Sequence, residues 1–233
     1  MTNFIDLVEV LYEDNHIIAV NKKSSDIVQG DKTGDKPLNE IVKTFIKEKY
    51  QKPGEVFLGT VHRIDRPVSG VVIFAKTSKA LERLNKMFNE KTVQKTYWAI
   101  VKNKPENNEG KLVHYLIKNE QKNKSTAYLK EVANSKKSEL VYKIIYQFNN
   151  YYLLEIKPLT GRHHQIRVQL SAMGCPIKGD LKYGFNRSNA DASISLHARK
   201  VEFTHPVTKE PVTIIAPPNV TDPLWKEAQE KVV

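Results

Sequence analysis

The sequence predicts a mixed α/β (α+β) fold, with one domain over residues 1–233 built on a central, largely antiparallel sheet flanked by helices. Strand-like apolar runs dominate the chain, and four of them follow one another between residues 111 and 157. Amphipathic helical patterns lie between other strands. No internal repeat or low-complexity linker interrupts the 233 residues, which are enough to bury a substantial core.

In the first part of the chain, clusters of turn residues separate the strands, and apolar residues at helical spacing predict the helices. Ser78 precedes the second helix and is expected to be its N-cap. The expected elements are strands at 7–12, 16–22 and 71–76, an exposed loop at 30–37, and helices at 38–50 and from 78.

The second part of the chain is richer in strands. Asn149 and Asn150 lie between two of them and indicate a hairpin, because Asn tolerates a positive φ. A helix at 162–173 is expected to start after the capping residue Thr160 and to end near Gly174. The remaining elements are strands at 95–101, 112–117, 125–132, 139–148, 151–157, 196–204 and 211–215, and a terminal helix from 221.

The chain is basic, because 37 Lys and Arg residues against 26 Asp and Glu residues give a formal charge of +11 and a pI near 9.5. Such an excess attracts phosphate-bearing partners, so nucleic acid is the favoured class of partner. Cys175 is the only cysteine, which argues against a disulfide framework. The N-terminus does not resemble a signal peptide, and no apolar run approaches the roughly 20 residues of a membrane span. We expect a cytoplasmic monomer without membrane attachment.

The chain is organised around the segment 62–70, His-Arg-Ile-Asp-Arg-Pro-Val-Ser-Gly, which leads directly into an apolar strand. Asp65 lies between two arginines on a loop that Pro67 and Gly70 restrict. Neighbouring cations favour the ionised carboxylate even in a pocket with little water, so this loop can present a nucleophile or a base beside a polyanion. The alternative is an Asp that caps the turn and pairs with Arg66, because structural ion pairs are commoner than catalytic ones.

Other catalytic arrangements find little support. The seven histidines are scattered, and His163 and His164 would point to different faces of a helix, so no metal site is expected. The sequence has no phosphate-binding Gly-rich loop, dinucleotide fingerprint or serine-hydrolase elbow. A glycosidase needs two cooperating carboxylates, and only Asp180 is available as a partner for Asp65. What remains is chemistry that one carboxylate performs without a cofactor or a metal.

The order of the motifs resembles that of the RluA-type RNA pseudouridine synthases. The segment 62–70 is similar to the catalytic motif of that family, and Leu-Tyr-Glu-Asp-Asn-His-Ile-Ile-Ala-Val-Asn-Lys at 11–22 resembles its opening motif. Two further motifs follow in the family's order, Lys-Thr-Tyr-Trp-Ala at 95–99 and Gly-Arg-His-His-Gln-Ile-Arg at 161–167. The resemblance covers nearly the whole chain and implies a single pseudouridine-synthase-like domain.

The resemblance implies an isomerase that converts uridine to pseudouridine in RNA without a cofactor. The N1–C1′ bond breaks, the uracil turns, and C5 bonds to C1′. Asp65 would assist by adding to C1′ or by removing the C2′ proton, and both routes remain open. Tyr97 would pack against the uracil and accept or relay the C5 proton, and Arg167 would pair with Asp65. A Tyr on a strand and an Arg on a helix also have purely structural interpretations.

Two segments depart from the family pattern. Lys22-Lys23-Ser24-Ser25 stands where the family usually has Lys-Pro-x-Gly, so a loop of different shape is expected there. His163 stands where the family usually has Thr or Ser, which puts any hydrogen bond from that hydroxyl in doubt.

The RNA itself would be a stem-loop of ribosomal or transfer RNA. The candidate RNA-binding residues are Arg63, Arg66, Arg162 and Lys22. By resemblance, Arg63 would fill the space that the flipped uridine leaves in the RNA stack, and a phosphate contact is the alternative. The lysines within 118–137 either face phosphates or protect exposed strands from aggregation. Because the first family motif begins near residue 11, no separate N-terminal RNA-binding domain is expected.

Two rival interpretations belong to other functional classes. One is an RNA-binding protein that keeps the fold but lacks activity, against which the presence of Asp65, Tyr97 and Arg167 argues. The other is a DNA-binding protein attracted by charge alone, but the sequence has no helix-turn-helix, zinc-finger or basic-zipper pattern.

Overall fold

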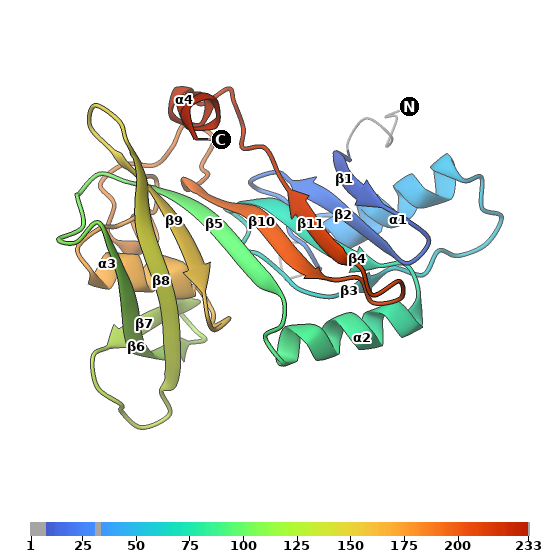
Figure 1. Cartoon of the computed structure of the whole chain (residues 1–233), viewed down its shortest axis with the longest axis horizontal. Helices are drawn as coiled ribbons and strands as arrows, with labels where there is room; N and C mark the ends of the chain where they lie inside the picture. Colours follow the sequence, from blue (N-terminus) through green and yellow to red (C-terminus); the bar gives the residue numbers. More distant parts are fainter. Residues whose placement is uncertain (1–7, 31–33, 233) are drawn as a thin grey trace. The chain divides into compact units, whose positions relative to one another are not determined.

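The computed structural model describes residues 8–30 and 34–232. Leu7 of the first expected strand and residues 31–33 of the expected loop lie outside the described residues. The chain forms two compact units, of which the first consists of the chain up to Gln94 together with Ala198–Pro217. The second unit consists of Lys95–His197 and the chain from Pro218. Each unit contains strands and helices of its own (Figure 1), and the single catalytic domain stays a prediction.

The strands of the first unit bring the end of β2 next to the start of β4. β1 (Val10–Glu13), β2 (Ile17–Lys22) and β4 (Ser69–Ala75) pair antiparallel in that order, and β3 (Gly59–Thr60) pairs with β4. β10 (Leu196–Thr204), which belongs to this unit from Ala198 onward, neighbours β4 and pairs with β11 (Pro211–Ile215). Lys22 of β2 lies opposite Gly70 of β4, where the segment 62–70 ends.

Two helices belong to the first unit, α1 (Leu38–Lys49) and α2 (Ser78–Asn89), and both lie where the apolar spacing predicts them. α2 contributes Ala80 and Leu84 to a buried core that includes Val71 of β4. The expected N-cap is wrong by one residue. Thr77 caps α2, because its extended backbone lets its hydroxyl accept a hydrogen bond from the Ala80 N–H at 3.2 Å.

The strands of the second unit pair antiparallel in the order β5-β9-β8-β6-β7. They are β5 (Gln94–Val101), β6 (Glu109–Asn119), β7 (Lys124–Tyr128), β8 (Lys136–Gln147) and β9 (Tyr152–Pro158). A hydrogen bond of 2.9 Å from Phe148 N–H to the Tyr151 carbonyl closes the β8–β9 hairpin, as expected. Asn149 and Asn150, however, are not among the residues with positive φ, so the expected conformation of the turn is wrong.

The helix α3 (Gln165–Ala172) is shorter than the expected helix at 162–173. His164 adopts a left-handed conformation with φ of 52°, which delays the start of the helix to Gln165. Thr160 does not cap it, because its hydroxyl donates to the Gln165 side-chain carbonyl (2.7 Å) and accepts from the Glu139 N–H (2.9 Å). A 3-10 helix, η2 (Leu181–Tyr183), follows α3.

The last helix, α4 (Pro223–Lys231), is capped by the Asp222 side chain and packs Trp225 into a core with Trp98 of β5. The predicted fold class is confirmed, since strands dominate and every strand pair with a described register is antiparallel. Within residues 8–30 and 34–232, no helix has the length and apolar character that crossing a membrane requires.

Candidate active site

The segment 62–70 forms most of the loop between β3 and β4 and the first two residues of β4 in the first unit, and Asp65 is half-buried on the loop. A turn closes the loop, with the Val68 N–H donating to the Asp65 carbonyl at 3.0 Å. Gly70 follows with φ of 116°, and a side chain there would collide with the backbone of Ala198. The turn and the glycine therefore fix the backbone of Asp65, as the sequence predicts.

Lys22 holds this loop from inside the unit. Its ammonium donates to three carbonyl oxygens, those of Lys23 (2.9 Å), Asp26 (2.7 Å) and Arg66 (3.1 Å). The residue is 1% exposed, and burial lowers its pKa from 10.5 to about 8, although Asp26 and Asp65 attract the charge. The predicted phosphate contact of Lys22 therefore lacks support, because its three donors already have acceptors inside the protein.

His62 anchors the other end of the loop. Its Nε2 accepts a hydrogen bond from the Ile73 N–H of β4 at 3.0 Å, and its ring stacks on Phe88 of α2 with the ring centroids 4.9 Å apart. The loop is thus attached to β4 and α2 before it reaches Asp65. His62 was not among the candidate residues, although its place at the start of the motif was the available signal.

The two arginines beside Asp65 are exposed. Arg66 forms an ion pair with Asp35, with Nη2 and Oδ2 2.6 Å apart, and within the described residues this is its only pairing with a carboxylate. The alternative interpretation, in which Asp65 pairs with Arg66, is therefore wrong. The backbone carbonyl of Arg66 instead helps to hold the loop, because it accepts hydrogen bonds from the Lys22 ammonium and from the Ser25 N–H (3.0 Å).

In the second unit, Tyr97 is half-buried on β5 opposite Ile156 of β9. Lys95 lies two residues earlier and therefore on the same face of the strand. Its ammonium lies beside Gly161, since a Cβ at Gly161 would be 3.9 Å from Lys95 Nζ, and burial lowers the pKa of Lys95. The face that carries Tyr97 thus also carries a cation that the sequence analysis did not single out.

Arg167 is held by a buried carboxylate. Its Nε donates to Asp180 Oδ2 at 2.7 Å and its Nη2 to Asp180 Oδ1 at 2.9 Å, and the two residues are 5% and 1% exposed. The guanidinium carbon also lies 5.0 Å from the centre of the Tyr183 ring. This two-point pairing fixes the plane of the guanidinium. A buried arginine requires an acid, and Asp180 was the available signal.

His164 and Tyr183 support the start of α3 next to this ion pair. The Tyr183 hydroxyl accepts from the Ser125 N–H at 2.8 Å and forms a second hydrogen bond of 2.9 Å with His164 Nδ1. Burial, and then the positive charge of Arg167, lowers the pKa of His164 to about 2. His164 is therefore neutral here and not an acid catalyst.

His163 replaces the hydroxyl residue that the family resemblance leads one to expect. Its Nδ1 lies 3.0 Å from the Ser125 hydroxyl and its Nε2 3.0 Å from Asn123 Oδ1, and its ring stacks on His164 with centroids 3.7 Å apart. The imidazole thus links the start of α3 to β7 and to the turn that precedes it. Arg162, one residue earlier, is exposed.

The candidate residues fall into two groups. Asp65, with Arg63, Arg66 and Lys22, belongs to the first unit, and Tyr97, with Arg162 and Arg167, belongs to the second. Within its own unit each group is held by the contacts described above. The predicted meeting of Asp65 with Tyr97 and Arg167 stays a prediction.

Comparison with known proteins adds independent information. The model of the family described as RNA pseudouridylate synthase matches residues 16–172, a range that includes Asp65, Tyr97 and Arg167. Ribosomal large subunit pseudouridine synthase C of Vibrio vulnificus is 36% identical over 214 residues, which cover 89% of this chain and 65% of that protein. The protein of the same name from Buchnera aphidicola is 37% identical over 223 residues, 92% of this chain and 68% of its own length.

The chain thus spans about two thirds of the length of these curated relatives. Among solved structures, human RNA pseudouridylate synthase domain containing 4 superposes with a TM-score of 0.77 at 22% identity, over 91% of this chain and 89% of that one. At this identity the likeness concerns the fold.

Proposed function

The chain belongs to the RNA pseudouridylate synthase family, and on this basis we propose that it isomerises uridine to pseudouridine in structured RNA. The observation that carries the proposal is the loop of Asp65, a half-buried carboxylate in the His-Arg-x-Asp motif whose backbone is held by Lys22, His62 and Gly70. The similar curated proteins are ribosomal large subunit synthases, which favours ribosomal over transfer RNA as the substrate.

The reaction is an isomerisation, so the product contains the same atoms as the substrate. The N1–C1′ bond breaks, the C5–C1′ bond forms, C5 loses a proton and N1 gains one. Asp65 acts on the sugar either as a nucleophile at C1′ or as the base that removes the C2′ proton. Both routes require an ionised carboxylate on a rigid backbone, and the Lys22 ammonium stabilises negative charge on Asp65.

Tyr97 and Arg167 have supporting roles in the proposal. The Tyr97 ring packs against the uracil while it turns and accepts or relays the C5 proton. The proposal assigns Arg167 the additional role of pairing with Asp65, whereas the pairing that the structure describes is with Asp180. A guanidinium has five N–H donors, enough to serve two carboxylates, and the bonds to Asp180 fix its plane.

The exposed arginines are the proposed contacts with RNA. Arg63 and Arg162 present their guanidinium groups to solvent, and Arg66 presents a group shared with Asp35. The lysine-rich segment 118–137 is a further candidate, in which Lys118 pairs with Glu120 and Lys137 with Glu139. Its other lysines, namely Lys122, Lys124, Lys130 and Lys136, are exposed and form no ion pair within the described residues. We further propose that the protein acts as a monomer in the cytoplasm, which light scattering and cell fractionation would test.

The direct test uses purified protein and ribosomal RNA from cells that lack this gene. The wild-type protein, Asp65→Asn and the control Glu40→Gln are incubated with the RNA without added nucleotide, and pseudouridine is mapped. Glu40 is a partly exposed carboxylate of α1 in the same unit that pairs with Lys43. We expect discrete new pseudouridines with the wild type and the control, and none with Asp65→Asn.

Binding is measured in parallel by filter retention of the same RNA. Asp65→Asn is expected to bind like the wild type, because the carboxamide keeps the shape of the side chain. Tight binding by the wild type without any product would instead support the rival interpretation, an RNA-binding protein with this fold and no activity.

A further inference from the structure

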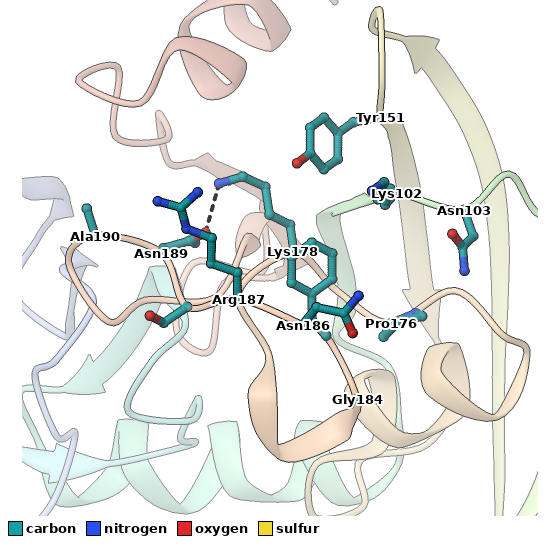
Figure 2. Close-up of a pocket in the computed structure, with 12 residues that line it drawn as sticks. Lys102, Asn103, Tyr151, Pro176, Lys178, Gly184, Asn186, Arg187, Asn189 and Ala190 are labelled. Atoms are coloured by element: carbon teal, nitrogen blue, oxygen red, sulfur yellow. Dashed lines mark hydrogen bonds between the residues drawn. The ribbon is translucent and has the colours of Figure 1, made fainter.

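A pocket of about 470 Å³ opens in the second unit, away from the side chains discussed so far. Its walls come from the residues after β5, from the β8–β9 hairpin and from the segment between Pro176 and Ala190. Figure 2 shows Lys178 and Arg187 extending on one side, Lys102 and Asn103 on the other, and the ring of Tyr151 between them in this view. The volume lies within the range of pockets that bind small organic groups.

The lining of this pocket carries positive charge that the protein does not neutralise. Three of the lining side chains are cationic, and none is a carboxylate. Lys178 is engaged, donating to Asn189 Oδ1 at 2.8 Å and pairing with Asp222 at 3.4 Å. Lys102 and Arg187 are exposed, and in the part of the chain that the structure describes neither forms an ion pair.

Some lysines on the strands of the same unit pair with nearby glutamates, namely Lys111, Lys118, Lys137, Lys143 and Lys157. Other exposed lysines, such as Lys104 and Lys136, form no ion pair in the described part of the chain. Lys102 and Arg187 differ from those lysines because they line a pocket whose wall holds no carboxylate.

The wall of the pocket is fixed and not a loose loop. The Lys178 N–H donates to the Ile100 carbonyl of β5 at 2.9 Å, and the Lys178 carbonyl accepts from the Ser195 N–H at 2.8 Å. Gly179 follows with φ of 87°, where a Cβ would lie 2.7 Å from the Ser193 carbonyl. Asn189 is tied by its amide to the hydroxyls of Ser193 and Ser195, each at 3.2 Å.

We propose that this pocket binds one nucleotide of a single-stranded part of the RNA, separate from the uridine that reacts. Lys102 and Arg187 contact the phosphates on either side of it, the Tyr151 ring stacks on its base, and the Asn186 amide meets a polar edge of the base. The Asn103 amide nitrogen already donates to the Gly174 carbonyl at 2.7 Å, so Asn103 offers its amide oxygen to the base. Unpaired nucleotides are bound by this combination of cations and aromatic rings. The inference rests on the proposed function, because it concerns the same RNA.

The position of the pocket along the chain fits this role. Lys102 lies five residues after Tyr97 and one residue past the end of β5, which corresponds to about 17 Å of extended chain. Lys178 precedes Asp180, the partner of Arg167, by two residues. A short stretch of RNA therefore connects a uracil at Tyr97 with a nucleotide in the pocket, and the pocket contributes to the choice of the RNA and not to the chemical step.

The first test removes two charges in two different places. Lys102→Gln with Arg187→Gln changes the pocket, and Lys143→Gln with Lys157→Gln changes two exposed strand lysines of the same unit. All variants carry Asp65→Asn, so that binding is read without turnover. The probe is a fluorescein-labelled single-stranded RNA of mixed sequence, and Kd is measured at several KCl concentrations.

We expect the variant Lys102→Gln with Arg187→Gln to bind the probe more weakly. The slope of log Kd against log salt should fall by about 1.4, the value for two lost contacts with single-stranded phosphates. The control variant, Lys143→Gln with Lys157→Gln, should change the slope by less than half as much. Equal changes of slope in the two double variants would overturn the proposal.

The second test separates stacking from charge. Tyr151→Leu is expected to weaken binding of the same probe about tenfold, whereas Tyr151→Phe keeps the ring and binds like the parent. Because Tyr151 also packs against the core around Trp98, urea unfolding of both variants checks that they are folded. Equal affinity of the two folded variants would contradict a stacked base.

The outcomes distinguish the pocket from the catalytic proposal. If the pocket variants bind the probe more weakly but the wild type makes no pseudouridine, the proposed activity fails and the RNA pocket stands. If the wild type makes pseudouridine and the pocket variants bind and react like the control pair, the activity stands and the pocket proposal fails. A supporting kinetic result is a higher half-saturating RNA concentration at an unchanged maximal rate.

Discussion

The loop of Asp65 and the helix of Arg167 each present a charged side chain, but they hold it by different means. In the first unit, the Lys22 ammonium donates hydrogen bonds to three backbone carbonyls, which fixes the backbone of the loop, and Asp65 is half-buried. In the second unit, Asp180 binds the guanidinium of Arg167 itself, and both side chains are buried. The contrast shows that the loop of Asp65 is held through contacts of its backbone, whereas the bonds to Asp180 hold Arg167 through its side chain.

The largest loss of stability is expected where the charged side chains themselves are in contact. Arg167→Met leaves the Asp180 carboxylate buried without its partner, which costs about 3–5 kcal/mol of unfolding free energy. Replacing both residues, as Arg167→Met with Asp180→Leu, should recover most of that loss, because no charge then remains buried. Urea unfolding monitored by circular dichroism measures both values.

A double variant no more stable than Arg167→Met alone would contradict this account of the pair. Both variants should fail to form pseudouridine, since neither keeps the guanidinium. The recovery of stability without activity would separate the structural contribution of Arg167 from its proposed role beside Asp65.

Removing the ammonium under the Asp65 loop is expected to have the next largest effect. Lys22→Met leaves three carbonyl oxygens without a donor and should cost about 2 kcal/mol of unfolding free energy. The rate of pseudouridine formation should fall as well, because the carbonyl of Arg66, next to Asp65, loses its anchor. Lys23→Met, which changes the exposed neighbouring lysine, is the matched control and should be close to neutral.

The same lysine predicts a pH dependence. The pKa of Lys22 is lowered from 10.5 to about 8 in the folded protein, so between these pH values the unfolded chain binds more protons at this position. The contribution of Lys22 to the free energy of unfolding therefore rises with pH from about 8 to 10.5. The difference between wild type and Lys22→Met, measured by urea unfolding across this range, should increase with pH. A difference that stays flat would argue against a buried ammonium.

A smaller loss is expected from the neutral hydrogen bonds behind Arg167. Tyr183→Phe removes the hydroxyl that accepts from the Ser125 N–H and is hydrogen-bonded to His164, at a cost of about 1 kcal/mol. The control is Tyr146→Phe, because the Tyr146 hydroxyl donates to Glu227, a partner that water can replace. If both variants have the same unfolding midpoint, the buried network beside α3 contributes nothing.

The smallest effect is expected at the side chain of Arg66. Arg66→Gln breaks its exposed ion pair with Asp35, which is worth about 0.2–1 kcal/mol. The carbonyl that Lys22 binds is unchanged in this variant. A loss of stability as large as that of Lys22→Met would show that the side chain, and not the backbone, supports the loop.

The regular elements around both regions could be predicted because their signals are local. The apolar run 71–76 and the helical spacing after 78 appear as β4 and α2, and the strands 196–204 and 211–215 appear with the expected bounds. The start of α3 could not be predicted, because Thr160 has the chemistry of a cap but binds Gln165 and Glu139 instead. A left-handed His164 has no sequence signal of its own.

The supporting contacts of the candidate site were missed for a related reason. From the sequence alone, Lys22 is expected to be a surface cation. In the structure, the pairing of β2 with β4 brings Lys22 to the carbonyl of Arg66, 44 residues later. From the sequence alone, Asp180 is expected to be a turn residue. In the structure, it supplies the negative charge that the buried Arg167 requires. Motif order therefore located the candidate catalytic residues, while the groups that hold them depend on the fold.

The most direct measurement of the central claim compares pseudouridine maps of all cellular RNA in cells with and without this gene. The account predicts that discrete pseudouridines in large-subunit ribosomal RNA disappear without the gene, and return when the wild-type chain is supplied but not when Asp65→Asn is supplied. Identical maps with and without the gene, or restoration of the modification by Asp65→Asn, would contradict it.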